Sequence, residues 1–180
     1  MLKLSLPKKV KFICGFIYSN EEDFSKIKKI MEKKYKGIDY ESKAIKFDFT
    51  DYYAKEMGRN LIRKFLSFKV LINPSALLRI KLYTLKLERK FSYQGKRKVN
   101  IDPGYLNDAK LVLATTKNFS HRIYLGKGIY AEVTLTYRKG EFTDFSWTYP
   151  DYRIPQYKDI FLKIRNLYLT QIRYVSKKQR

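Results

Sequence analysis

The chain has 180 residues, of which 44% are hydrophobic, and a formal net charge of +22. This length suits a single domain with its own core. One cysteine excludes an intramolecular disulfide, and one cysteine with one histidine excludes a structural zinc site. Because no apolar stretch approaches the roughly 20 residues that cross a bilayer, we expect a soluble protein of the reducing cytoplasm with no membrane contact.

The positive charge has two interpretations. An excess of cations is typical of proteins that bind nucleic acid or another polyanion. However, the basic residues are 28 Lys and 11 Arg, and Arg is the residue that recognises phosphates and bases in a bidentate manner. A chain rich in Lys, Ile, Tyr, Phe and Asn is also what an AT-rich genome encodes. Nucleic-acid binding through a lysine-rich surface is therefore an alternative, not a conclusion.

The first predicted element is a buried strand over residues 10–18, in which Cys14 should be an inert thiol. The pattern Ser19-x-x-Glu22 predicts a capping box before an amphipathic helix that ends at Gly37. Lysines crowd the rest of that helix, at positions 26, 28, 29, 33, 34 and 36. Together with the basic C-terminal tail, they form the surface where polynucleotide binding would be expected.

The pattern of residues 40–49 predicts a second strand. A short helix that ends at Gly58 should follow it. Apolar residues then alternate over residues 62–72, the pattern of a half-buried strand. Asn73-Pro74 next starts a helix whose interior covers residues 77–91, because Pro suits the first helical position.

The following part of the chain, as far as Phe142, predicts an antiparallel meander with turns at Gly126-Lys-Gly128 and Arg138-Lys-Gly140. Its expected strands cover residues 99–102, 111–115, 122–125 and 129–137. A last amphipathic helix follows Pro155 and leads into a basic tail, residues 176–180, that we expect to fray. The sequence thus predicts a single α+β domain, with one mixed and largely antiparallel sheet covered by about three helices.

The hairpin over residues 121–133 holds the first candidate site. A three-residue loop places Arg122 opposite Glu132, whereas a two-residue loop, Gly126-Lys127, places His121 there. The pair is then a surface ion pair of at most about 1 kcal/mol, or Glu132 orients His121 for acid-base work. A further alternative is that Arg122, His121 and Lys127 bind an anion such as a phosphate or carboxylate.

Two other segments offer oxygen ligands. Asp48 and Asp51 lie where the second strand meets the short helix. One interpretation is that Thr50 or Asp51 is the N-cap of that helix. The other is that the two carboxylates bind a divalent metal, Mg²⁺ or Mn²⁺. Asn100 and Asp102 project from one face of their strand, as ligand-binding side chains would. The alternative is that Asp102-Pro-Gly is an ordinary turn.

The aromatic segment WTYPDYR, residues 147–153, either closes the edge of a core or offers rings on which a base could stack. Several nucleotide and hydrolase motifs are absent. There is no GxxxxGK[ST] loop, no GxGxxG that opens a helix and no GxSxG elbow. A nucleotide, if one binds, must therefore bind by other means.

Five segments, taken together, resemble the bacterial family of domains of unknown function numbered 4416. They are KFDFTDYYAKEMG (46–58), FLSF (65–68), RKVNIDPGYL (97–106), LVLATTKNFSHRIYLGKGIYAEVTLTY (111–137) and WTYPDYR (147–153). The resemblance covers nearly the whole chain and implies no particular activity, cofactor or partner. It does imply that the candidate residues lie in family-like motifs and the lysine-rich helix does not. Those residues are Asp48, Asp51, Asn100, Asp102, His121, Arg122 and Glu132.

Three functions remain open at this point. The first is a binding domain for an anionic small molecule or nucleotide, through Arg122, His121 and Lys127 with Asn100 and Asp102. The second is an enzyme in which His121 and Glu132 form an acid-base pair and the aspartates place a divalent metal. The third is a polynucleotide-binding protein.

Overall fold

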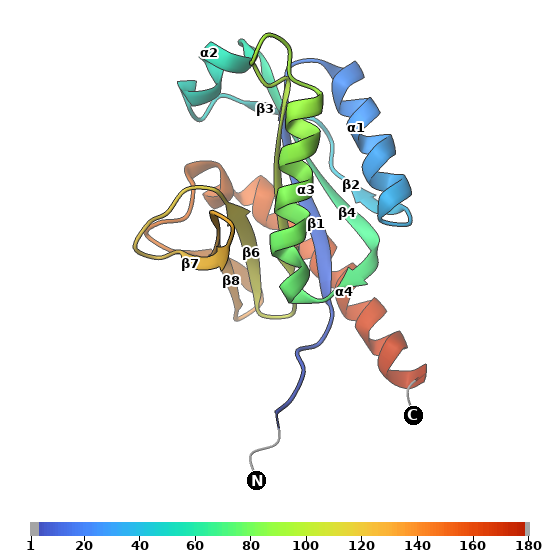
Figure 1. The fold of residues 1–180 in the computed structure, drawn as a ribbon. Coiled ribbons are helices and arrows are strands. Elements are labelled where there is room, and N and C mark those ends of the chain that lie inside the picture. Colours follow the sequence, from blue (N-terminus) through green and yellow to red (C-terminus); the bar gives the residue numbers. More distant parts are fainter. Residues whose placement is uncertain (1–3, 179–180) are drawn as a thin grey trace.

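The computed structural model describes residues 4–178 and centres on one nine-stranded sheet (Figure 1). The strands are β1 (Val10–Tyr18), β2 (Ile38–Glu41), β3 (Ile45–Phe47), β4 (Leu61–Ile72), β5 (Val99–Leu106), β6 (Lys110–Thr115), β7 (Ile123–Gly126), β8 (Ile129–Arg138) and β9 (Glu141–Asp144). Their order is β2-β4-β1-β5-β6-β8-β7, with β3 paired to β4 and β9 paired to β8. Every one of these pairings is antiparallel.

Helices cover both faces of the sheet, which confirms the α+β prediction. The α-helices are α1 (Glu21–Lys34), α2 (Ala54–Met57), α3 (Leu77–Lys90) and α4 (Pro155–Lys178), and 3-10 turns cover Asp51–Tyr53 (η1), Pro74–Ala76 (η2) and Pro150–Arg153 (η3). Figure 1 shows α3 in front of the sheet and α4 behind it. Alternation along β1 supplies both cores, since Phe12, Phe16 and the buried Cys14 pack toward α1 and α3, whereas Ile13 packs toward α4.

Two predictions about the first half of the chain need correction. The α1 helix is capped by Asn20, not Ser19, because the Asn20 side chain accepts hydrogen bonds from the backbone N–H groups of Glu22 and Asp23. The single strand expected over residues 40–49 is two short strands, β2 and β3, that pair one after the other along the same strand, β4. Thr50 caps η1 as predicted.

The β5 strand also differs from the prediction. Asp102-Pro103-Gly104 is not a turn but lies inside β5, opposite Gly15, Cys14 and Ile13 of β1. Pro is tolerated there because β6 pairs with β5 only from Gly104 onward, so the missing N–H of Pro103 leaves no ladder bond unmade.

The β7–β8 turn is Lys127-Gly128, and a bulge at Leu125 precedes it. The two-residue alternative, Gly126-Lys127, is therefore wrong, and Ile123 lies opposite Ala131, which is the register that the three-residue loop predicts. Residues 176–178 of the tail belong to α4, and residues 179 and 180 lie outside the described residues. No helix within residues 4–178 is both long enough and apolar enough to cross a membrane.

Candidate functional site

A cavity of about 480 Å³ opens where β5 and β6 separate. The two strands are paired only from Gly104–Leu113 to Leu106–Leu111, and beyond this point they diverge. Figure 1 shows the segment that carries α2 on one side of this region and β6–β8 on the other, with α3 running past both. Lining residues come from both of these segments and also from α3 and η3. The volume lies within the range of small-molecule sites.

Side chains of α3 take the place of a neighbouring strand beside the cavity. Lys81 donates from Nζ to the carbonyl oxygen of Ile101 at 2.9 Å. Glu88 accepts from the backbone N–H of the same residue at 2.7 Å. Both backbone groups of Ile101 are thereby satisfied without β6, which removes the cost of leaving them unpaired in a buried position.

Arg63 of β4 lines the cavity, and only 3% of its side chain is exposed. Its guanidinium pairs with Asp102 at 3.1 Å and with Asp151 of η3 at 2.7 Å. Gly15 makes room for it, because a Cβ at that position would lie 2.9 Å from Nη1. Burial raises the pKa of the Asp151 carboxyl, although the charge of Arg63 acts in the opposite direction.

Arg97 fixes the orientation of Asn100. The Arg97 guanidinium binds Glu56 through Nε and Nη2, at 2.8 and 2.7 Å, and donates from Nη1 to Oδ1 of Asn100 at 3.0 Å. Because a guanidinium only donates, the atom that faces it must be the amide oxygen. The amide nitrogen therefore points elsewhere, and this buried Nδ2 has no hydrogen-bond partner.

The hairpin cluster forms as a three-membered unit around Glu132. Arg122 donates from Nε to Oε2 of Glu132 at 2.8 Å, and Nε2 of His121 lies 3.1 Å from the same oxygen. Both alternative partners of Glu132 are thus in contact with it. Arg122 also donates to the Lys117 carbonyl and the Tyr149 hydroxyl, at 2.9 and 2.7 Å. Its hydrogen bonds tie the β6–β7 loop to the segment before η3.

The structure brings some of the predicted site residues together and leaves others apart. Asn100, Asp102 and Glu132 all line the cavity. His121 and Arg122 bind Glu132 but are not lining residues.

The remaining three predicted residues lie elsewhere. Lys127 sits in the β7–β8 turn, and Asp48 and Asp51 are exposed. Asp48 forms a surface ion pair with Lys46 at 3.0 Å. Within the described part of the chain, no three His, Cys, Asp or Glu side chains group closely enough to hold a metal ion.

Sequence reasoning missed most of the charged residues of the cavity. They are Arg63, Lys81, Glu88, Arg97, Lys117 and Asp151. A signal was present for three of them. Arg63 shares a strand face with Leu61 and Phe65, and Lys81 and Glu88 stand seven residues apart on the apolar face of a helix. Charges at such inward positions indicate a buried polar site.

The fold and the cavity define a class of protein, namely an α+β domain whose covered antiparallel sheet holds a polar cavity at a break in its strand pairing. The chain belongs to the family described as "Domain of unknown function (DUF4416)", whose model matches residues 8–168. This match confirms the family resemblance of the five segments. No curated protein and no solved structure matches the chain.

Proposed function

We propose that the cavity binds a small molecule and that the chain is a ligand-binding domain. The observation that carries this proposal is the amide nitrogen of Asn100, a buried donor without a partner in a residue that lines the cavity. A buried donor that loses its water partners costs about 1–3 kcal/mol unless something accepts its hydrogen bond. A ligand oxygen or ring nitrogen would supply that acceptor.

The lining also indicates the kind of ligand. Aromatic side chains form much of the wall, including Phe49, Tyr53 and Tyr149, and such rings favour a planar, unsaturated ligand. At the rim, Lys117 places its ammonium 4.0 Å from the ring centre of Tyr52. Among the described residues it has no acidic partner within salt-bridge distance, so its charge is available to an anionic group.

A planar heterocycle with an acceptor and an attached anionic group meets these requirements. Nucleoside monophosphates are therefore the first probes to use, and flat aromatic carboxylates are the second. The charges deeper in the cavity do not require an anion, because Arg63 is balanced by Asp102 and Asp151 and Arg97 by Glu56.

The test is mass spectrometry of protein purified at low salt, followed by titration with those probes. The decisive variant is Asn100→Asp, which keeps an oxygen for Arg97 but replaces the amide donor by an acceptor. Asn166→Asp makes the same change at an exposed position of α4 and serves as the control. We expect Asn100→Asp alone to lose the copurified molecule or to weaken probe binding at least about tenfold. Equal binding by both variants, or no ligand at all, would refute the proposal.

One observation favours catalysis as a second candidate function. Asp102 lines the cavity with 25% of its side chain exposed, whereas both oxygens of Glu132 already accept hydrogen bonds. Asp102, rather than a His121–Glu132 pair, is then the residue placed to exchange a proton with a ligand. If the bound molecule is turned over, Asp102→Asn should retain binding and lose turnover in a single-turnover assay.

A further inference from the structure

Four rings form a column outside the cavity, and the proposed ligand site does not use them. Phe119 contacts His121 with ring centres 5.4 Å apart, and His121 stacks on Trp147 at 5.1 Å. Trp147 stacks in turn on Phe145, at 4.6 Å and 4° from parallel. The indole N–H donates to the Val133 carbonyl at 3.1 Å, which fixes the orientation of Trp147. The WTYPDYR segment and the β6–β7 loop thus build a rigid aromatic surface.

One end of this column is open to solvent. Phe119 is 65% exposed, and the β7 residues Ile123 and Tyr124, which point to opposite faces of the strand, are 70% and 60% exposed. Large apolar side chains exposed on the surface of a domain are typical of a binding site. Because Phe119 is exposed and its ring is tilted by 56° from that of His121, a further flat ring can pack on Phe119.

Two cations belong to the segments that carry these exposed rings. Arg153 is held beside Trp147 by hydrogen bonds to the carbonyls of Ser146 and Thr148, both at 2.8 Å. Lys127 occupies the turn that follows β7, whereas the ammonium of Lys117 lies over Tyr52 at the rim of the cavity.

The acids in the same region are already compensated. Glu132 is buried against Arg122 and His121. Asp144 pairs with Lys158 at 2.5 Å. The surface around the column is therefore positive, and its charge complements a polyanion.

We propose that this surface binds single-stranded nucleic acid. Bases stack on the exposed rings of Phe119 and Tyr124, and the phosphates contact Lys127 and Arg153. A duplex fits less well, because its bases are already stacked on each other and cannot reach the rings. This binding is independent of the small-molecule site, since neither the stacking rings nor Lys127 and Arg153 line the cavity.

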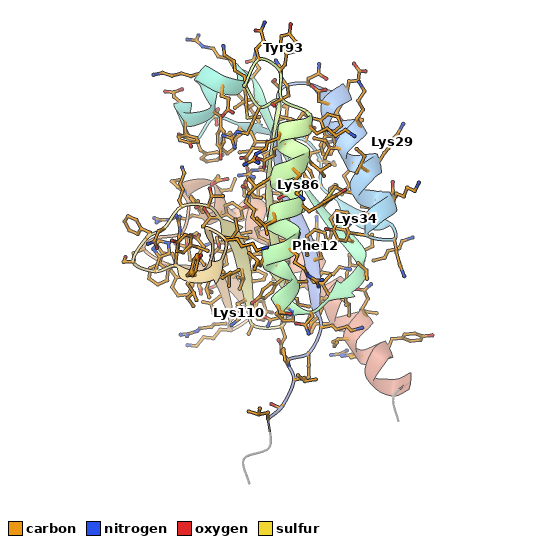
Figure 2. All side chains as sticks on the ribbon, in the orientation of Figure 1. Phe12, Lys29, Lys34, Lys86, Tyr93 and Lys110 are labelled. Atoms are coloured by element: carbon orange, nitrogen blue, oxygen red, sulfur yellow. The ribbon has the colours of Figure 1, made fainter. Side chains whose placement is uncertain are left out.

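The test is fluorescence anisotropy with labelled oligouridylate and oligothymidylate of about 12 nucleotides and with a duplex of the same length. The variants are Phe119→Ala and Tyr124→Ala. The control is Tyr93→Ala, which removes an equally exposed ring, 65%, from the α3–β5 loop at the far end of the molecule (Figure 2). Circular dichroism checks that every variant is folded.

We expect Phe119→Ala and Tyr124→Ala each to weaken single-strand binding about fivefold or more, which is the lower end of the range for stacking of a base on an aromatic side chain. Tyr93→Ala should change this binding less than twofold. Lys127→Met should lower the slope of log K against log salt by about 0.7, the value for one lost phosphate contact on a single strand. Binding should also change the fluorescence of Trp147, the single tryptophan of the chain.

Two results would overturn the proposal. One is equal binding of duplex and single strand with no effect of Phe119→Ala, which would mean that net charge alone attracts the polymer. The other is absence of binding at low salt. Neither result would touch the cavity, which Asn100→Asp tests separately. A preference for uridylate over thymidylate, or the reverse, would identify which polymer the surface supports.

Discussion

At the scale of single residues, buried charges define the region around the cavity. Arg63 pairs with both Asp102 and Asp151, while Lys81 and Glu88, which lies 3.6 Å from the Arg97 guanidinium, hold the backbone of β5. Removing Arg63 would leave both carboxylates without their cationic partner, and breaking a buried ion pair in this way typically costs about 3–5 kcal/mol. These residues are therefore expected to support the cavity structurally, whatever ligand it takes.

The pH dependence of stability tests the state of Glu88. Burial raises the pKa of its carboxyl, with Lys81 acting in the opposite direction, so the folded state holds this proton more tightly than the unfolded chain. The stability that the protonated carboxyl contributes is then lost as pH rises from the unfolded value, about 4.3, through the higher folded value. Glu88→Gln keeps an acceptor for the Ile101 N–H but has no such proton to lose.

As pH rises across that window, we expect the wild type to lose unfolding free energy relative to Glu88→Gln, so that the variant becomes the more favoured of the two. Urea unfolding at several pH values measures it. A difference that does not change with pH would mean that the carboxyl has the same pKa in both states.

At the scale of elements, the α1 helix shows how a cap is chosen. Ser19, in the pattern Ser19-x-x-Glu22, and Asn20 are alternative N-caps for the same helix. The structure places Asn20 at the N-cap, where its side chain accepts hydrogen bonds from two backbone N–H groups at 2.8 and 3.1 Å. Both side chains suit the position by type. The end of β1 decides between them, because Tyr18 is the last residue paired with β4 and β5.

Asn20→Ala should cost about 1 kcal/mol of stability, the usual worth of an N-cap side chain, and lower the melting temperature by roughly 2–4 °C for a chain of this size. Ser19→Ala, one residue earlier, should change it by less than about 1 °C. Thermal unfolding by circular dichroism distinguishes the two. The reverse order of effects would show that the capping box forms in solution.

At the scale of the whole molecule, the sheet consists of two parts with a narrow junction. The β1 strand is paired along its length on both sides, by β4 and β5. In contrast, β6–β9 join the rest of the sheet through three register pairs between β5 and β6. The cavity lies at this junction, where relative movement of the two parts would change its shape.

Native-state hydrogen exchange should therefore show two levels of protection. Amides of β8 are expected to exchange through an opening that costs less free energy than the global unfolding that exposes β1. A ligand in the cavity should raise the protection of β8, because it contacts lining residues on both sides of the junction. Identical opening free energies for β1 and β8 would contradict this division.

Much of the fold follows from local patterns. An apolar run predicts β1, alternation predicts β4, and turn signals predict the β6–β8 strands. The helical period predicts α1 and α4, Asn73-Pro74 marks the start of the α3 region, and Gly58 and the Lys139-Gly140 turn mark where elements end. The predictions that were wrong share a cause. Asp102-Pro103-Gly104 has the composition of a turn, but its conformation was decided by the pairing with β1, which local sequence does not contain.

Local sequence patterns were sufficient for the fold class, the family resemblance and three residues of the candidate site, since Asn100, Asp102 and Glu132 were identified from strand faces and hairpin spacing. That these three residues share a cavity with Arg63, Asp151 and the α3 side chains follows only from the folded arrangement. The physical reason is that secondary structure depends on neighbours along the chain, whereas a cavity depends on distant strands that part. Ion pairs such as Arg63–Asp151, 88 residues apart, exist only after the sheet has formed.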